Sequence, residues 1–407
     1  MRNNIHPDEA VRICEAEGRK NRSCLKRETV PLPEALGRVL PAELASPIDH
    51  PPFHKSAMDG FAYGQKSPTG LYRVVDEIAA GQYSGRALQP GEAARIMTGA
   101  PIPPGAAGVQ RIEWTRDVER DPEGRPIVAF TREETADNII RRGENLKAGA
   151  ALLGPRILAP QDLGILAAAG FSSVEVLARP RVGVVSTGDE IVVAGNPLDD
   201  ASIYDSNGPQ LTAQASAAGC QARFFGIAGD EERDLKTLLA AALESCDLVL
   251  VSGGVSMGDF DLVPSVLESL GVETLFHSIA MRPGKPTFFG RRGNAAVFGL
   301  PGNPVSTFVN FEILAKAYLG ALQGLQAAPR LIRARLAAPL ARKGSDRVEF
   351  LPAALFPAED GMAARPLRYH GSSMITVLAQ ADALLRMEIG VESMEEGALV
   401  DARLIRP

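Results

Sequence analysis

The feature of the sequence that most constrains the fold is an alternation of strand-like and helix-like segments between residues 179 and 326. The strand-like segments are Val182-Gly183-Val184-Val185, Arg223-Phe224-Phe225-Gly226-Ile227 and Leu248-Val249-Leu250-Val251. Helical patterns follow them at 211–218, 235–243 and 262–270. Strands that alternate with helices of this length form βαβ units around a parallel sheet. We therefore expect an α/β protein with several domains, whose central domain, residues 179–326, holds a mostly parallel sheet.

The rest of the chain divides around this central domain. Short helical patterns, one of which Asp8 could cap, predict a helical and linker domain made of residues 1–48 and 148–178. Residues 49–147 are punctuated by proline and glycine and contain short alternating segments, which predicts an inserted β-rich lobe. Strand-like segments after Gly324 predict a small C-terminal β-barrel over residues 327–407.

The charge balance excludes some function classes. The chain has 43 lysine and arginine residues and 49 aspartate and glutamate residues, so its formal net charge is −6. A protein without a broad cationic surface is not expected to bind nucleic acid through counterion release. No segment reaches the roughly 18 apolar residues of a membrane span. Four scattered cysteines without a CxxC pair indicate a reducing compartment, so we expect a cytoplasmic protein with no membrane partner.

Acidic residues and glycines follow the predicted strands. Parallel strands end at one edge of a sheet, where the loops form the usual ligand site. Glu190, Asp230, Asp259 and Asp261 stand in these loops, together with the glycines of Ser252-Gly253-Gly254. Glycines let backbone amides approach an anion, and carboxylates suit a Mg²⁺ that bridges to phosphate or another oxyanion. A single aspartate could equally cap a helix, but four acidic residues at corresponding strand ends favour a ligand site.

Other motifs narrow the chemistry. Gly253 to Gly258 has the glycine spacing of a P-loop, but Asp259 stands where the phosphate-binding lysine belongs, so a Walker NTPase is not expected. Arg282 and Lys285, the latter inside Pro-Gly-Lys-Pro, are candidate cationic contacts to an anionic ligand. No covalent nucleophile stands out, so catalysis would depend on a metal, positioning and oxyanion contacts.

The loops, taken together, resemble the molybdopterin molybdenumtransferase family (MoeA, with the E domain of gephyrin as its eukaryotic relative). The matching segments occur in the family's order: Ser56-Ala57-Met58-Asp59-Gly60, Met97-Thr98-Gly99-Ala100, Arg142-Gly143-Glu144-Asn145, Ser186-Thr187-Gly188-Asp189-Glu190, Asp205-Ser206-Asn207, Ser252-Gly253-Gly254-Val255-Ser256, Gly258-Asp259-Phe260-Asp261, Pro283-Gly284-Lys285-Pro286 and Pro301-Gly302-Asn303-Pro304. Each segment alone is weakly specific, but the ordered set is highly specific.

This resemblance implies a homodimer with four domains per subunit, the third of which is like molybdopterin adenylyltransferase. It implies insertion of molybdate into adenylylated molybdopterin with Mg²⁺, which releases AMP and forms molybdenum cofactor. The implied catalytic residues are Asp59, Thr98, Asp230 and Asp261, and the implied metal site consists of Glu190, Asp230 and Asp261. The implied substrate-binding residues are Ser252, Gly253, Gly254, Ser256, Asp259, Arg282, Lys285, Pro301, Asn303, Pro304 and Ser372. Implied partners are molybdopterin adenylyltransferase and molybdoenzymes or their chaperones.

The chain departs from the family pattern at several positions. Asn145 stands where aspartate is usual, Arg282 replaces a more common lysine, and Pro352 stands where an arginine often occurs. These departures keep two alternatives open. One is a non-catalytic paralogue that binds pterin or serves as a scaffold, and the other is a molybdopterin adenylyltransferase, which would consume ATP.

Overall fold

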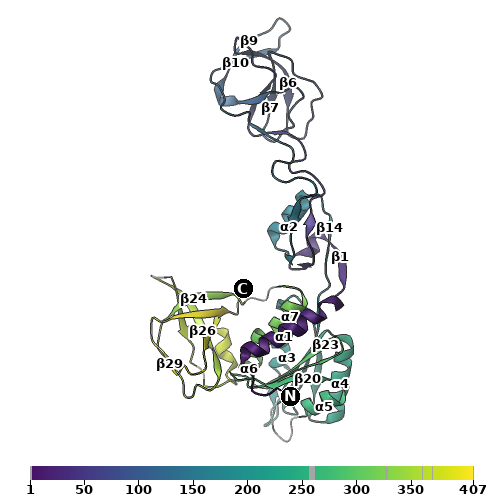
Figure 1. Ribbon diagram of the computed structural model, residues 1–407, viewed down its shortest axis with the longest axis vertical. Coiled ribbons are helices and arrows are strands. Elements are labelled where there is room, and N and C mark those ends of the chain that lie inside the picture. The colour runs from purple at the N-terminus through teal and green to yellow at the C-terminus, as the bar shows by residue number, and fades with distance from the viewer. Residues whose placement is uncertain (1, 256–261, 326–328, 360, 369, 407) are drawn as a thin grey trace. The chain divides into compact units, whose positions relative to one another are not determined.

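The computed structural model describes residues 2–255, 262–325, 329–359, 361–368 and 370–406 (Figure 1). The chain forms two compact units. The first comprises Met1–Thr29, Gly37–Pro41 and Glu175–Pro407, and the second comprises Val30–Leu36 and Ala42–Val174. The division falls within strands β1 (Arg27–Pro31) and β14 (Ser173–Leu177). The borders of the four predicted domains stay predictions, because each unit is larger than one of those domains.

A mixed sheet lies at the centre of the first unit. Its strands, in spatial order, are β18 (Gln221–Ala228), β15 (Arg181–Thr187), β19 (Leu248–Ser252), β23 (Ala295–Leu300), β22 (Pro286–Arg292) and β20 (Glu273–Ser278). The first four run parallel, as the sequence predicts, whereas β22 and β20 are antiparallel to their neighbours. The physical reason is the two-residue turn Gly293-Asn294 between β22 and β23, since so short a connection can join only antiparallel strands.

Helices cover both faces of this sheet (Figure 1). They are α1 (Pro7–Asn21), α3 (Asn207–Ala217), α4 (Glu232–Ser245), α5 (Val263–Ser269), α6 (Pro304–Asn310) and α7 (Lys316–Leu322), with a π-helical turn at Phe311–Ala315. Val182, Val184 and Leu250 join a core with α1, α3, α6 and α7, whereas Val185 and Val251 join a second core with α4 and α5. Successive strand residues point to opposite faces, so continuous apolar strands bury both faces and confirm the α/β class.

A β-barrel completes the first unit. It consists of β24 (Leu331–Leu336), β26 (Val348–Ala358), β27 (Gly361–Pro366), β28 (Ala383–Met387) and β30 (Leu399–Leu404), and the pairing of β26 with both β27 and β28 closes it. The short strands β25 (Leu340–Ala341) and β29 (Ser393–Met394) pair beside it. Strand β21 (Met281–Arg282) pairs in parallel with the start of β26 and so connects the barrel to the α/β part. The predicted C-terminal barrel is confirmed.

The second unit is mainly β structure. Its largest sheet has the order β8 (Gly108–Arg111), β5 (Gly60–Tyr63), β7 (Glu92–Ile96), β6 (Leu71–Ile78), β10 (Pro126–Phe130) and β9 (Thr115–Arg120). Shorter strands are β3 (Leu44–Ala45), β4 (Lys55–Ser56), β11 (Ile139–Ile140), β12 (Ala151–Leu153) and β13 (Arg156–Ile157), and the helix is α2 (Pro160–Ala168). Gly60 belongs to β5, and a Cβ there would lie within 3.1 Å of Cα of Arg111, so β5 and β8 approach closely.

The N-terminal region agrees only in part with the prediction of short helices. It has one longer helix, α1, and short 3-10 turns at Arg22–Cys24 and Leu32–Ala35, the second of which lies where a second helix is predicted. Strands β1, β2 (Val39–Leu40) and β3 lie in the same region. The cap also differs: Nδ1 of His6 accepts a hydrogen bond from the Asp8 backbone amide at 3.3 Å. Asp8 instead lies in the first turn, where its carboxylate binds both Nη atoms of Arg386 at 2.7 and 2.9 Å. Proline at the first helical position favours this earlier start. Among the described residues, no helix is long and apolar enough to cross a membrane.

Helix α1 packs closely on α7 at Gly18. A Cβ at Gly18 would meet the backbone carbonyl oxygen of Tyr318 and would lie 2.9 Å from Cβ of Ala321. Near the same contact, Nδ2 of Asn21 donates to the buried Tyr318 hydroxyl at 3.3 Å. The glycine therefore permits an approach that a larger residue would prevent.

We predict that Gly18→Ala destabilises the protein although alanine favours helix. The clash with the α7 backbone should cost about 1–3 kcal/mol of unfolding free energy. The matched control is Gly164→Ala in α2, where a Cβ meets nothing within 4 Å. It should stabilise by about 0.4–1 kcal/mol, because alanine restricts the unfolded chain. Calorimetry should therefore show opposite shifts of melting temperature, and a higher melting temperature for Gly18→Ala would contradict the packing argument.

Candidate functional site

The carboxyl ends of the parallel strands are fastened to one another by buried polar groups. Nδ2 of Asn207, at the start of α3, donates to Oγ of Ser252 at 2.6 Å and to the Gly302 carbonyl oxygen at 2.7 Å. Oγ of Ser186 donates to Asp205 at 2.9 Å. The end of β15, the end of β19 and the loop after β23 are thereby held in one arrangement.

Glycines bring two of these loops into close contact. Gly253 has φ +99°, and a Cβ there would lie 2.6 Å from Oγ1 of Thr187. Gly188 has φ +130°, and a Cβ there would lie 2.9 Å from Cδ of Glu190. Both positions therefore require glycine for backbone conformation and for space. The predicted glycine loop thus exposes its backbone to the space beyond the sheet.

A cavity of about 520 Å³ opens at this edge of the sheet. Predicted site residues that line it are Glu190, Asp230, Ser252, Gly253, Gly254, Pro301 and Asn303. Asp205 and Asn207 line it too, although neither was among the predicted site residues. The sequence feature that could have identified them is their position in the Asp-Ser-Asn segment directly before a predicted helix. We name this space the acidic cavity, because carboxylates dominate its charged lining.

Helix capping does not explain Asp230. The N-cap of α4 is Glu231, and no side-chain capping bond forms there. The Asp230 backbone amide instead donates a hydrogen bond to Oδ1 of Asp189 at 2.9 Å. The Asp230 loop is thus fixed by Asp189, while Asp230 itself lines the acidic cavity.

The predicted Mg²⁺ site can be compared with the structure only in part. Ser256, Asp259 and Asp261 lie outside the described residues. Within the described ranges, no three acidic, histidine or cysteine side chains cluster closely enough to form a metal site by themselves. The donors that line the acidic cavity are nevertheless all oxygen, from Glu190, Asp205 and Asp230. Hard oxygen donors of this kind fit Mg²⁺, which also keeps several water ligands.

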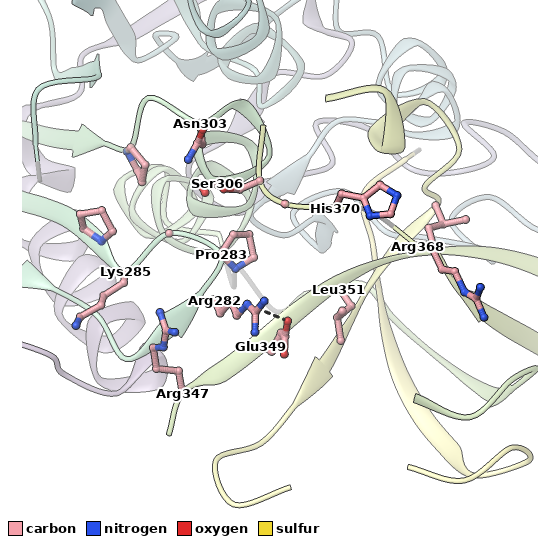
Figure 2. A pocket seen from close by; sticks show the side chains of 16 residues that line it. Arg282, Pro283, Lys285, Asn303, Ser306, Arg347, Glu349, Leu351, Arg368 and His370 are labelled. Atoms are coloured by element: carbon pink, nitrogen blue, oxygen red, sulfur yellow. Dashed lines mark ion pairs between the residues drawn. The ribbon is translucent and has the colours of Figure 1, made fainter. Parts of the chain in front are cut away.

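A second cavity of about 720 Å³ lies between the α/β part and the barrel (Figure 2). Its cationic lining residues are Arg282, Lys285, Arg347 and Arg368, with His370 beside them. Ser372 and Asn303 of the predicted site line it as well. We name it the cationic cavity. It shares Pro286, Pro301 and Asn303 with the acidic cavity, so the two spaces have a common wall.

The loop that carries Lys285 is held by contacts with Thr287 and Asn310. Gly284 has φ +97°, and a Cβ there would overlap the side-chain amide of Asn310. Oγ1 of the buried Thr287 donates to the Gly284 carbonyl oxygen at 2.8 Å and contacts Oδ1 of Asn310 at 3.0 Å. This network fixes the backbone of the loop that carries Lys285 to helix α6.

Not every predicted residue lines a cavity. Pro304 begins α6, and its carbonyl oxygen accepts a hydrogen bond from Nε2 of Gln210 at 3.2 Å, so it shapes the helix start. The Ser372 carbonyl oxygen accepts from the Val305 amide at 3.0 Å and fastens the barrel segment to the same turn. Arg347, Glu349, Arg368 and His370 were not among the predicted site residues, because only the barrel's folding brings them to the cavity that Lys285 also lines.

The two predicted residues of the second unit meet each other. Oδ1 of Asp59 accepts hydrogen bonds from the Thr98 backbone amide at 2.6 Å and from Oγ1 of Thr98 at 2.7 Å. Led by the backbone hydrogen bond, these contacts lower the pKa of Asp59 below its ordinary value. The pair lies on exposed loops, where an ionised carboxylate is available to solvent.

Models of known families match the chain in three places. Residues 5–170 match the MoeA N-terminal region (domain I and II), residues 183–321 match a probable molybdopterin binding domain, and residues 333–405 match the MoeA C-terminal region (domain IV).

Whole proteins are similar over nearly their full length. The molybdopterin molybdenumtransferase of Bacillus subtilis is 34% identical, with 99% of this chain and 94% of that protein covered. The Staphylococcus epidermidis molybdopterin molybdenumtransferase is 32% identical, with 93% and 91% covered. The crystal structure of a molybdopterin biosynthesis MoeA protein from Pyrococcus horikosii matches with a TM-score of 0.83 at 31% identity, covering all of both chains. The chain is therefore an enzyme of molybdenum cofactor biosynthesis and belongs to the MoeA family of molybdopterin molybdenumtransferases.

Proposed function

We propose that this enzyme inserts molybdate into adenylylated molybdopterin with Mg²⁺, releasing AMP and forming molybdenum cofactor. The observation that carries the proposal is the wall shared by the acidic and cationic cavities, made of Pro286, Pro301 and Asn303. Two anionic substrates must react, so their sites must adjoin and their charges must be offset separately. Adjoining cavities of different electrostatic character support that requirement.

The acidic cavity is the proposed site of the adenylylated pterin. Backbone amides of the Gly253-Gly254 loop would bind its phosphates, because glycine allows their close approach. Glu190 and Asp230 would hold Mg²⁺, together with Asp261. When bound, Mg²⁺ supplies positive charge that polarises the phosphate oxygens and offsets the negative charge of the leaving AMP. Asn207 and Ser252 keep the strand ends in place while the phosphate bond breaks.

The cationic cavity is the proposed molybdate site. Lys285 and Arg282 would bind its oxygens, with Ser372 as a further hydrogen-bonding group. A tetrahedral dianion is strongly hydrated, so several donors must replace its water before it can react. The Asn310 and Thr287 network helps, because it fixes the Lys285 loop before the anion arrives. Molybdate bound beside the wall that the two cavities share would face the proposed pterin site.

The proposal extends to assembly and partners. We propose a homodimer in which Asp59 and Thr98 of one subunit complete the cleft of the other. The exposed Asp59 and Thr98 loops and the family membership support this arrangement. An adenylylated substrate requires an earlier adenylyl transfer, so a molybdopterin adenylyltransferase is the expected supplier. Molybdoenzymes or their chaperones would receive the product, in the cytoplasm.

The proposed function first predicts the requirements of the reaction itself. Purified enzyme with adenylylated molybdopterin and Mg²⁺ should release AMP only when molybdate is added. Lys285→Ala should raise the KM for molybdate about 10–100-fold, as expected for the loss of a charged hydrogen bond. The exposed Lys236→Ala in α4 is the matched control and should behave as wild type. ATP consumption with free molybdopterin would instead indicate the adenylyltransferase, and pterin binding without AMP release would indicate the scaffold paralogue.

A second prediction tests the shared cleft. Asp59→Asn and Asp230→Asn should each be inactive as homodimers. After subunit exchange, a mixture should regain about a quarter of wild-type activity, because half of the dimers then hold one intact site of two. Each variant incubated alone is the control. No recovery, despite mixed dimers observed by native mass spectrometry, would place both aspartates in one subunit's site, and a monomeric mass by light scattering would reject the dimer.

A third prediction follows from the pKa of Asp59, which Thr98 lowers. A lowered pKa keeps the carboxylate ionised as the pH falls, so activity that needs this charge is lost only at low pH. Thr98→Val removes the hydroxyl donor and should move the acid limb of the pH–rate profile for AMP release to higher pH. Thr69→Val, on another loop of the same unit, should leave the limb unchanged. A limb that moves to lower pH would contradict the role of ionised Asp59.

A further inference from the structure

The cationic cavity contains a buried carboxylate whose presence in an anion site requires an explanation. Glu349 lines the cavity from β26 and is only 4% exposed. Its charge opposes the binding of an oxyanion, and burial makes an ionised carboxylate costly. A buried carboxylate is retained where charged partners offset it, so its neighbours decide what it does.

The backbone places Glu349 next to Arg282. Strand β21 pairs in parallel with β26 in the register that sets Arg282 opposite Glu349. Nε of Arg282 lies 3.4 Å from Oε1 of Glu349, as the dashed line in Figure 2 marks. The Arg282 side chain is 51% exposed, and among the described residues this is the one ion pair that it forms.

The other guanidinium near Glu349 is already engaged. Nη1 of Arg342 lies 3.6 Å from Oε2 of Glu349, but it donates to the Arg347 carbonyl oxygen at 2.7 Å. Nε of Arg342 donates to the Val391 carbonyl oxygen at 2.7 Å. Oε2 of Glu349 is buried and, among the described residues, accepts no hydrogen bond. Arg342 thus offsets the charge of Glu349 without donating a hydrogen bond to it, and Arg282 is the more exposed of the two cationic partners.

We propose that Glu349 is a positioning residue of the oxyanion site: its carboxylate holds the Arg282 guanidinium at the cavity and limits the cavity's positive charge. The inference rests on the proposed molybdate site and adds the residue that sets its charge and geometry. Orientation of Arg282 favours the reacting arrangement, whereas the negative charge weakens ground-state binding of the dianion. The two effects act in opposite directions on kcat and on affinity.

Glu349→Gln separates these effects, because glutamine keeps the shape and removes the charge. It should bind molybdate about 3–10-fold more tightly by calorimetry, since a nearby negative charge is gone. Its kcat for AMP release should fall, since Arg282 is no longer held. The matched control is Glu388→Gln, which removes an exposed carboxylate paired with Arg386 at 2.7 Å outside the cavity lining. The control should match wild type in both measurements.

A purely structural role predicts the opposite sign: weaker binding together with a lower melting temperature. Weaker or unchanged molybdate binding by folded Glu349→Gln would therefore overturn the proposal. If that variant does not fold, Glu349→Asp decides, because it retains the charge but withdraws it from Arg282. The aspartate variant should lose kcat without gaining affinity, and a wild-type kcat would overturn the proposal. If wild-type protein binds no molybdate at all, the proposed function fails first, which a calorimetric titration of wild type establishes separately.

Discussion

The burial of both faces of the central sheet is the constraint on which the rest of the structure depends. Val182 and Val184 face one apolar core and Val185 faces the other, so those strand interiors have no room for polar chemistry. Polar side chains are consequently gathered where the strands end. There they must satisfy one another, as Asn207 does by joining Ser252 to Gly302. The acidic cavity thus lies at the strand ends because both faces of the sheet are buried.

The cationic cavity has a different origin. It forms because β21 leaves the α/β part and pairs with β26 of the barrel, which sets Arg282 beside Glu349. The loop of Lys285 is fixed separately by Asn310 below it. Charges that would repel one another in an open loop are here distributed around a cavity and partly offset by a carboxylate. The oxyanion proposed for this site would exchange its water for donors that are already in position.

The two cavities differ in charge from the modestly acidic chain as a whole. The net charge of −6 describes the whole molecule, whereas binding depends on the local field. Glycines expose backbone amides on one side of the shared wall, and arginine and lysine side chains line the other. Hydrogen bonds from Thr98 lower the pKa of Asp59 in the second unit. Each charged group is therefore controlled by its immediate neighbours.

Much of this organisation could be predicted from the sequence. The alternating pattern indicated the α/β class, and glycine and acidic loops at strand ends identified Glu190, Asp230, Ser252 and Gly253, because strand ends and glycine conformations are local properties. The order of the motifs indicated the family. The predicted cap of α1 was wrong, because Asp8 pairs with Arg386, which is distant in sequence and which no local pattern reveals.

What only the tertiary structure decided is the environment of each charge. In the sequence, Glu349 looks like an ordinary strand residue. Its environment depends on the pairing of β26 with β21, which places Arg282 opposite it. Arg368 and His370 likewise reach the cavity only after the barrel closes. The sequence by itself determined the strands, the glycine loops and the family, because these follow from short-range periodicity and motif order. Tertiary structure decided which charges meet, because electrostatic interactions depend on distance in space and on burial.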